Sequence, residues 1–201
     1  MLKRSALFIF ALLWLALILA ACGGAQKEAT EAALNAAQTA LDTAQGEAAK
    51  YAPDELHAAQ AAMQRARDAL AKGNYDAALD AAKDAANKTR ELTASAAAKK
   101  QELTKTWASL NQGASKAMDE VKRRLDAYSH GAKLPPGLDK SQLDDAKAQY
   151  EQLKQQWSDA AAAAQKGNLP DAVAKASIWK EALAKLMELL GIKITTPAPS
   201  N

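Results

Sequence analysis

From Ala29 to Leu190 the apolar residues of this 201-residue chain recur at spacings of three and four, and no stretch alternates between apolar and polar residues. Such spacing places side chains on one stripe of an α-helix, whereas a β-strand requires alternation. More than half of the apolar residues are alanine, which favours helix but buries little surface. The sequence therefore predicts an all-α fold, built as an elongated antiparallel helical bundle.

Helix-breaking residues divide this pattern into five expected helices. Pro53, followed by two carboxylates, is typical of a first helical turn. Gly73-Asn74 predicts a tight turn between antiparallel helices, and residues 131–138 predict a longer connection. Asp139 and Gln142 have the spacing of a capping box. The expected helices cover residues 27–51, 53–72, 75–130, 140–166 and 169–190.

The turn sequence Lys72-Gly73-Asn74 recurs 94 residues later as Lys166-Gly167-Asn168, each time between two alanine-rich helices. The recurrence indicates an internal duplication, and a chance match between alanine-rich segments explains it equally well. A duplication would make one long helix common to two three-helix bundles, over residues 29–112 and 113–191. Whether that helix continues through Gly113 stays open. Residues 192–201 are expected to form a disordered tail.

The first 21 residues have the three-part layout of an export signal. Lys3 and Arg4 give a positive start, residues 6–21 form an uninterrupted apolar run, and Cys22 follows. A spanning helix needs roughly 20 apolar residues, and this run ends without a basic flank. A cleaved signal peptide over residues 1–21 is therefore favoured over a retained anchor helix.

Residues Leu19-Ala20-Ala21-Cys22 resemble the lipobox of bacterial lipoproteins. The resemblance implies cleavage before Cys22 and attachment of acyl chains such as palmitate to that residue, which would anchor the mature chain in a membrane. Residues 22–28 would then form the lipidated N-terminus and a short linker. Gly23 is not the Asp that typically retains lipoproteins at the inner membrane. The resemblance therefore implies the outer membrane, on its periplasmic face.

The segment of the mature part from Tyr51-Ala52-Pro53-Asp54-Glu55-Leu56 through Gly73-Asn74-Tyr75-Asp76-Ala77-Ala78-Leu79 resembles a family of small helical envelope lipoproteins of unknown function. That resemblance implies no activity. A catalytic or metal site requires convergent polar groups, and the chain has only two histidines, far apart, and one cysteine. His57 is expected to be exposed, and His130 is expected to complement the end of a helix dipole. We therefore expect no enzymatic activity, no cofactor and no metal site.

The remaining polar and aromatic residues have structural interpretations. Removal of Lys3 and Arg4 with the signal would leave 24 basic residues against 23 acidic ones. The basic cluster at residues 122–124 lies between acidic neighbours, which favours a solvated helix face over a nucleic-acid site. Carboxylate pairs such as Asp144-Asp145 point about 100° apart on a helix, so they are expected to be solvating charges. The tryptophans at 107, 157 and 179 lie on apolar stripes and are expected to pack in the core.

These features favour a lipid-anchored structural or interaction module of the bacterial envelope. It would dock an unidentified envelope protein or associate with itself, with no nucleic-acid partner. The alternative is a periplasmic binding module, in which a groove between the two bundles holds a lipid or another hydrophobic ligand. Because the mature chain has few Phe, Ile and Met residues to line a large cavity, the first interpretation is favoured.

Overall fold

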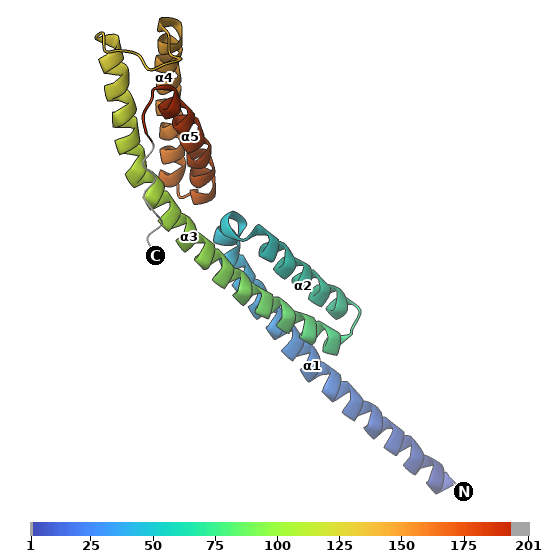
Figure 1. The fold of residues 1–201 in the computed structure, drawn as a ribbon. Coiled ribbons are helices and arrows are strands. Elements are labelled where there is room, and N and C mark those ends of the chain that lie inside the picture. Colours follow the sequence, from blue (N-terminus) through green and yellow to red (C-terminus); the bar gives the residue numbers. More distant parts are fainter. Residues whose placement is uncertain (1, 194–201) are drawn as a thin grey trace. The chain divides into compact units, whose positions relative to one another are not determined.

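The structure is a computed structural model that describes the backbone of residues 2–193 and the side chains of residues 24–193. Every regular element in this range is an α-helix, which confirms the all-α prediction (Figure 1). The helices are α1 (Leu2–Tyr51), α2 (Pro53–Ala71), α3 (Tyr75–Ser129), α4 (Lys140–Gln165) and α5 (Leu169–Leu189).

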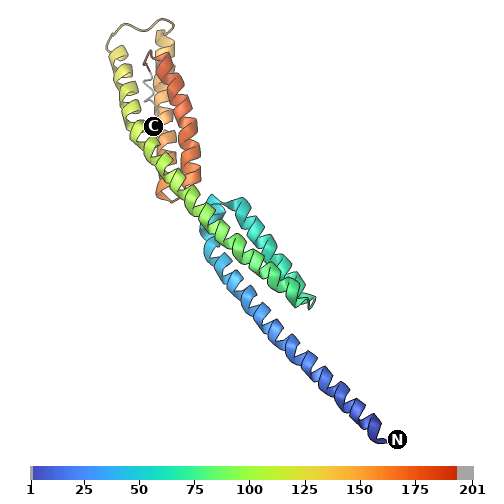
Figure 2. The same cartoon turned by 60° about the horizontal axis from the view of Figure 1, so that its bottom comes forward.

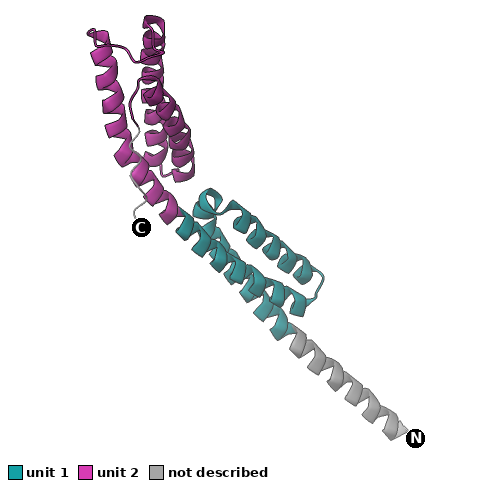
Figure 3. Cartoon of the chain, viewed as in Figure 1, with its two compact units in different colours: residues 1–99 teal, residues 100–201 magenta. Residues whose placement is uncertain are grey.

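The chain divides into two compact units, residues 1–99 and residues 100–201 (Figure 3). Helix α3 runs without interruption through Gly113 and contributes its first part to unit 1 and its second part to unit 2. The sequence analysis placed the division after residue 112. The structure places it earlier, after Lys99. Trp107, which lies between these two positions on α3, stacks on Trp157 of α4 with ring centroids 5.4 Å apart, so this stretch of α3 contacts unit 2.

Unit 1 consists of α1, α2 and the first part of α3, which lie side by side in both Figure 1 and Figure 2. Its core is formed by the expected stripes, which are largely alanine with a few larger residues such as Leu41 and Met63. The buried Thr30 hydroxyl donates to the Gln26 carbonyl and, at 3.4 Å, to the Tyr75 carbonyl. This hydrogen bond ties α1 to the first residue of α3.

Unit 2 consists of the second part of α3 with α4 and α5, and its core contains larger side chains. Leucines dominate it, together with Val121, Tyr128 and Trp179. The buried Tyr128 hydroxyl donates to the Leu190 carbonyl at 2.8 Å, which joins the end of α3 to the end of α5. Because leucine and tryptophan bury more apolar surface than alanine, each helix contact contributes more stabilisation here than in unit 1.

Helix ends follow the local chemistry of the sequence. Asp139 accepts from the Gln142 backbone N–H at 2.8 Å while the Gln142 side chain accepts from the Asp139 N–H at 2.9 Å, so the predicted capping box is present. Gly73 and Gly167 both have φ +71, a left-handed conformation that glycine adopts without strain. The residues after them, Asn74 and Asn168, both accept from a backbone N–H three residues later and so begin the next helix.

The two units repeat each other in the placement of buried residues. Between residues 78 and 96, in the first part of α3, every buried residue has a buried counterpart 94 residues later, in α5 or directly after it. The end of α1 matches the end of α3 at an offset of 77, which pairs Tyr51 with Tyr128. This register supports the internal duplication. The pairs at offset 94 are Ala78 and Ala172, Ala82 and Ala176, Ala85 and Trp179, Thr89 and Leu183, Leu92 and Leu186, and Ala96 and Leu190.

Two expectations differ from the observed helix bounds. Helix α1 begins at Leu2 and includes residues 22–28, where a short linker was expected. A glycine inside a helix costs only about 1 kcal/mol relative to alanine, so the two glycines there do not end an alanine-rich helix. The expected tail of residues 192–201 also begins too early. Ile192 is buried and its N–H donates to the Met187 carbonyl at 2.9 Å, because an apolar residue after a C-terminal glycine packs back on the helix. Residues 194–201 lie outside the described residues.

Candidate functional site

The proposed lipidation site, Cys22, lies outside the residues whose side chains the structure describes, as does the rest of the motif at residues 19–22. The described chain resumes at Gly24, which is exposed, and the first fully buried side chain is that of Thr30. The geometry around Cys22 therefore contributes nothing to its assignment, which rests on the sequence motif.

The two histidines belong to different units and do not form a site together. His57 is exposed on α2 in unit 1. His130 follows α3 in unit 2, and its Nδ1 lies 2.7 Å from the Asp126 carbonyl oxygen. Since a carbonyl oxygen only accepts, Nδ1 is the protonated nitrogen in this contact. His130 thus caps the last turn of α3, as the sequence analysis expected.

Most of the ion pairs among the described residues join two residues of the same helix. Lys122 bonds Asp126 at 2.8 Å, Arg123 bonds Glu120, and Lys147 bonds Asp144 at 3.1 Å. Hydrogen bonding to Asp126 raises the pKa of Lys122. Within residues 24–193, no group of three or more His, Cys, Asp or Glu side chains is placed to hold a metal ion. These pairs solvate the helices, and they leave no cluster of unpaired basic residues at positions 122–124.

Each helical segment of unit 2 contributes one tryptophan to a stacked group. Trp107 of α3 and Trp157 of α4 are nearly parallel, and Trp157 and Trp179 of α5 have centroids 4.5 Å apart at a tilt of 47°. Trp179 is only 3% exposed, and its Nε1 is a buried donor with no acceptor among the described residues. Trp107 and Trp157 are half-buried rather than core residues. A buried N–H without an acceptor is uncommon and costs free energy unless a ligand or water completes it.

Trp179 also lines a groove of about 950 Å³ within unit 2, between α3 and α5, which we call the unit 2 groove. Small residues contribute to its lining, among them Gly113 and Ala117 of α3 and Ala184 of α5. A Cβ atom added at Gly113 would have no other atom within 4 Å. Larger apolar residues, Leu110, Leu183 and Met187, form the rest of its floor. The sequence analysis considered a groove between the bundles, whereas this groove lies inside one of them.

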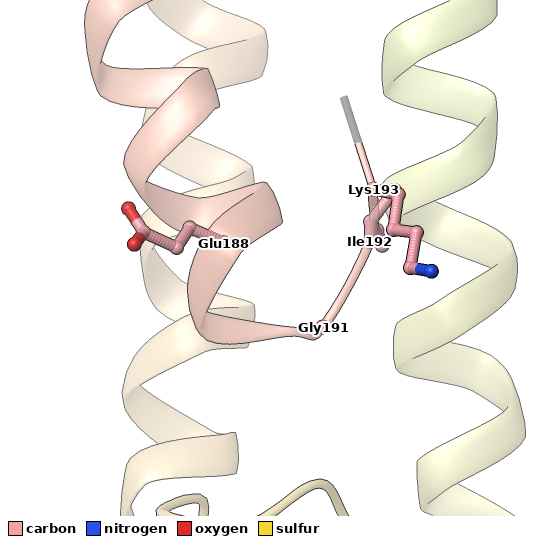
Figure 4. Close-up of a pocket in the computed structure, with 4 residues that line it drawn as sticks. All are labelled: Glu188, Gly191, Ile192 and Lys193. Atoms are coloured by element: carbon pink, nitrogen blue, oxygen red, sulfur yellow. The ribbon is translucent and has the colours of Figure 1, made fainter. Parts of the chain in front are cut away.

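The segment after α5 forms one border of the unit 2 groove. Gly191, Ile192 and Lys193 line both this groove and a smaller adjoining pocket of about 370 Å³, which Glu188 completes (Figure 4). In Figure 4 this segment crosses from α5 toward α3, and the Glu188 side chain points away from it. The buried Ile192 thus places the exposed Lys193 at the edge of the groove.

Unit 1 has a smaller groove, of about 550 Å³, at the equivalent place between α1 and α3, which we call the unit 1 groove. The same offsets that relate the buried residues relate the lining residues. At an offset of 77, Ala33, Ala36, Ala37 and Ala40 match Leu110, Gly113, Ala114 and Ala117. At an offset of 94, Ala86, Thr89, Arg90 and Thr93 match Lys180, Leu183, Ala184 and Met187. An open face between the first and third segments is therefore a property of the repeated fold, and only its lining differs.

Sequence reasoning missed both grooves because helical periodicity identifies the buried stripe but not which helix pair leaves a gap. An alignment of the two units, with residue numbers offset by 77 in the first segment and by 94 in the third, would have been the useful signal. It places two small residues, Ala36 and Gly113, at equivalent positions.

Comparisons of the chain with known protein families, with curated proteins and with solved structures found no match. Among residues 24–193, no helix combines the length and the apolar character needed to cross a bilayer. The apolar run at residues 6–21 lies outside that range.

Proposed function

We propose that the chain is a bacterial lipoprotein that acts as a structural or interaction module of the cell envelope, tethered to a membrane through Cys22. The observation that carries the proposal is the order of elements at the N-terminus. The chain begins with positive residues, continues with an apolar run over residues 6–21 and reaches Leu19-Ala20-Ala21-Cys22 at the end of that run. An export signal followed by a lipobox has the same order of elements.

Acylation accounts for durable attachment to a membrane. Each buried methylene contributes about 0.8 kcal/mol, so two or more acyl chains hold a protein on a bilayer where a single chain binds reversibly. We place the protein at the outer membrane, facing the periplasm, because Gly23 follows the cysteine. The helix then begins almost at the lipid, because α1 includes residues 22–28.

An interaction role suits the surfaces that the two units present. Ion pairs along single helices keep the surface solvated, while Ile178 is 67% exposed and each unit carries an open groove. We propose an unidentified envelope protein or a second copy of the chain as the partner. We propose no nucleic-acid partner, no cofactor and no catalytic activity.

The test of the proposal is the chemical state of Cys22 in the protein extracted from bacterial membranes. Intact mass spectrometry should find a chain that begins at residue 22 and carries the added mass of acyl chains. Cys22→Ser should abolish both the cleavage and the added mass. The matched control is Gly24→Ser, which introduces the same side chain two residues away and should leave processing unchanged. An unmodified chain that begins at Met1 would contradict the proposal.

The partner is approached by crosslinking in intact cells, comparing wild type with Cys22→Ser. A partner of the envelope should be crosslinked by the tethered protein and lost when the tether is removed. Crosslinks that are identical for both proteins would separate partner binding from membrane attachment and would argue against a role that depends on the anchor.

A further inference from the structure

The unit 2 groove combines an apolar floor with a basic rim. We propose that it binds an anionic amphiphile with a single alkyl or acyl chain, the chain lying on the floor and the anionic head group at the rim. This inference goes beyond the proposed function and does not depend on acylation of Cys22. It concerns residues 109–193, all of which lie within the described range.

The floor matches an alkyl chain in character and size. Its side chains are aliphatic or aromatic, with Trp179 and Leu183 buried and Met187 half-buried. A volume of about 950 Å³ lies within the range of pockets that enclose small ligands. The groove follows α3 from Ser109 to Arg124, a rise of about 22 Å at 1.5 Å per residue. A groove of this length with an apolar floor accommodates a linear chain better than a compact ligand.

The rim supplies charge complementarity to an anion. Lys116 and Arg124 of α3, Lys180 of α5 and the following Lys193 line the groove, against a single carboxylate, that of Glu120. Glu120 is already paired with Arg123, which lies outside the groove. Among the described residues neither Lys116 nor Lys180 has an ion-pair partner. Basic side chains left unpaired beside an apolar floor favour a ligand that carries negative charge.

A second observation in the same groove is the buried Nε1 of Trp179. This donor has no acceptor among the described residues, although the indole lines the groove. The unit 1 groove has neither feature, because its lining contains one basic residue, Arg90, among alanines and threonines, and Ala85 stands where unit 2 has Trp179. The recurrence of the gap belongs to the fold, whereas the ligand-binding chemistry belongs to unit 2 alone.

The test uses residues 22–201 carrying Cys22→Ser, which retains every described side chain without attached lipid. Isothermal titration calorimetry measures binding of dodecyl phosphate below its critical micelle concentration, and tryptophan fluorescence follows the group formed by Trp107, Trp157 and Trp179. The comparison ligands are dodecyl maltoside and dodecyltrimethylammonium, which have the same alkyl chain, and inorganic phosphate, which has none. Dodecyl phosphate should bind at least tenfold more tightly than each of the other three. Equal binding of all three amphiphiles would overturn the proposal, and so would equal binding of inorganic phosphate.

Filling the groove provides the sharpest variant. Gly113→Leu places a side chain into open space, and it should not disturb folding because it replaces a glycine inside a helix. It should weaken binding of dodecyl phosphate at least tenfold without lowering the melting temperature. The matched control is Ala36→Leu at the equivalent position of unit 1, which should leave binding unchanged. Unchanged affinity in Gly113→Leu would overturn the proposal.

Charge reversal tests the rim. Lys180→Glu should weaken binding about tenfold, whereas Lys185→Glu makes the same change on the same helix outside the groove and should have no effect. Other occupants give different results. If only a chain ending at Lys193 binds dodecyl phosphate, residues 194–201 occupy the groove and the proposal fails. It also fails if Gly113→Leu changes the oligomeric state while the amphiphile does not bind, because the groove is then a protein interface.

Discussion

Unit 1 and unit 2 should unfold as partly separate bodies, and a single core leucine in each can demonstrate it. Leu153 of α4 and Leu41 of α1 are both 3% exposed, so they form a matched pair with one member in each unit. Truncating a buried leucine to alanine costs roughly 2–5 kcal/mol. A typical small domain has a total stability of about 5–15 kcal/mol, so either change removes a large part of the stability of its own unit.

The tryptophans make the two units distinguishable. Trp107, Trp157 and Trp179 all lie in unit 2, and the fourth, Trp14, lies in the proposed signal peptide. Tryptophan fluorescence of residues 22–201 therefore reports unit 2 alone, whereas circular dichroism at about 222 nm, near the minimum of the helix spectrum, reports both units. In wild type the two urea unfolding curves should not overlay.

The variants should act on different signals. With a urea m-value of about 1 kcal/mol/M for a unit of this size, Leu153→Ala should lower the fluorescence midpoint by about 2 M or more. Part of the helical signal should remain at its original midpoint. Leu41→Ala should leave the fluorescence midpoint in place and lower part of the dichroism curve. Coincident curves in wild type and in both variants would refute the reasoning, because they would show one cooperative unit.

Three further predictions concern local features, each measured by urea unfolding. Gly73→Ala should destabilise unit 1 by about 1–2 kcal/mol, because φ is +71 at this position. Gly46→Ala, inside α1 with no other atom near the added Cβ, should stabilise unit 1 by about 0.5–1 kcal/mol. Equal effects of the two substitutions would contradict the turn geometry. Asp139→Ala should lower the stability of unit 2 by about 1 kcal/mol through loss of the capping box, and a change within error would count against it. Burial raises the pKa of Tyr150, so the unfolded chain releases the phenol proton first, and the free energy of unfolding should fall as pH rises above about 10. Tyr150→Phe should have a shallower pH dependence than wild type, and parallel profiles would exclude this contribution.

The parts of the fold that were predictable are those decided by a few neighbouring residues. Pro53 starts α2, Gly73 ends the turn before α3, and Asp139 with Gln142 begins α4, because each acts through backbone hydrogen bonds within one turn. The apolar stripes were predictable for the same reason, since helical periodicity is local. The half-buried positions, such as Tyr150, depend on which neighbouring helix covers them and were not resolved by periodicity.

The features that were missed depend on contacts between distant residues. The division of α3 at Lys99 leaves no local mark, because the helix continues and the division follows from contacts with other helices, such as the stacking of Trp107 on α4. The alignment of the units was obscured because its offset changes from 77 to 94 across the longer connection between α3 and α4. The groove required knowledge of the gap between α3 and α5. Cys22 stays a prediction from sequence, because its side chain lies outside the described residues.

The end of α5 differs from the equivalent point of unit 1 in one residue. Gly191 has φ +67 and follows the last turn of the third segment of unit 2. At the offset of 94 its counterpart is Ala97, where the helix continues into unit 2. One position therefore holds a residue that continues the helix in the first copy and a residue that ends the helix in the second. Alanine at position 191 would remove the left-handed conformation that ends α5 and would favour continuation of that helix.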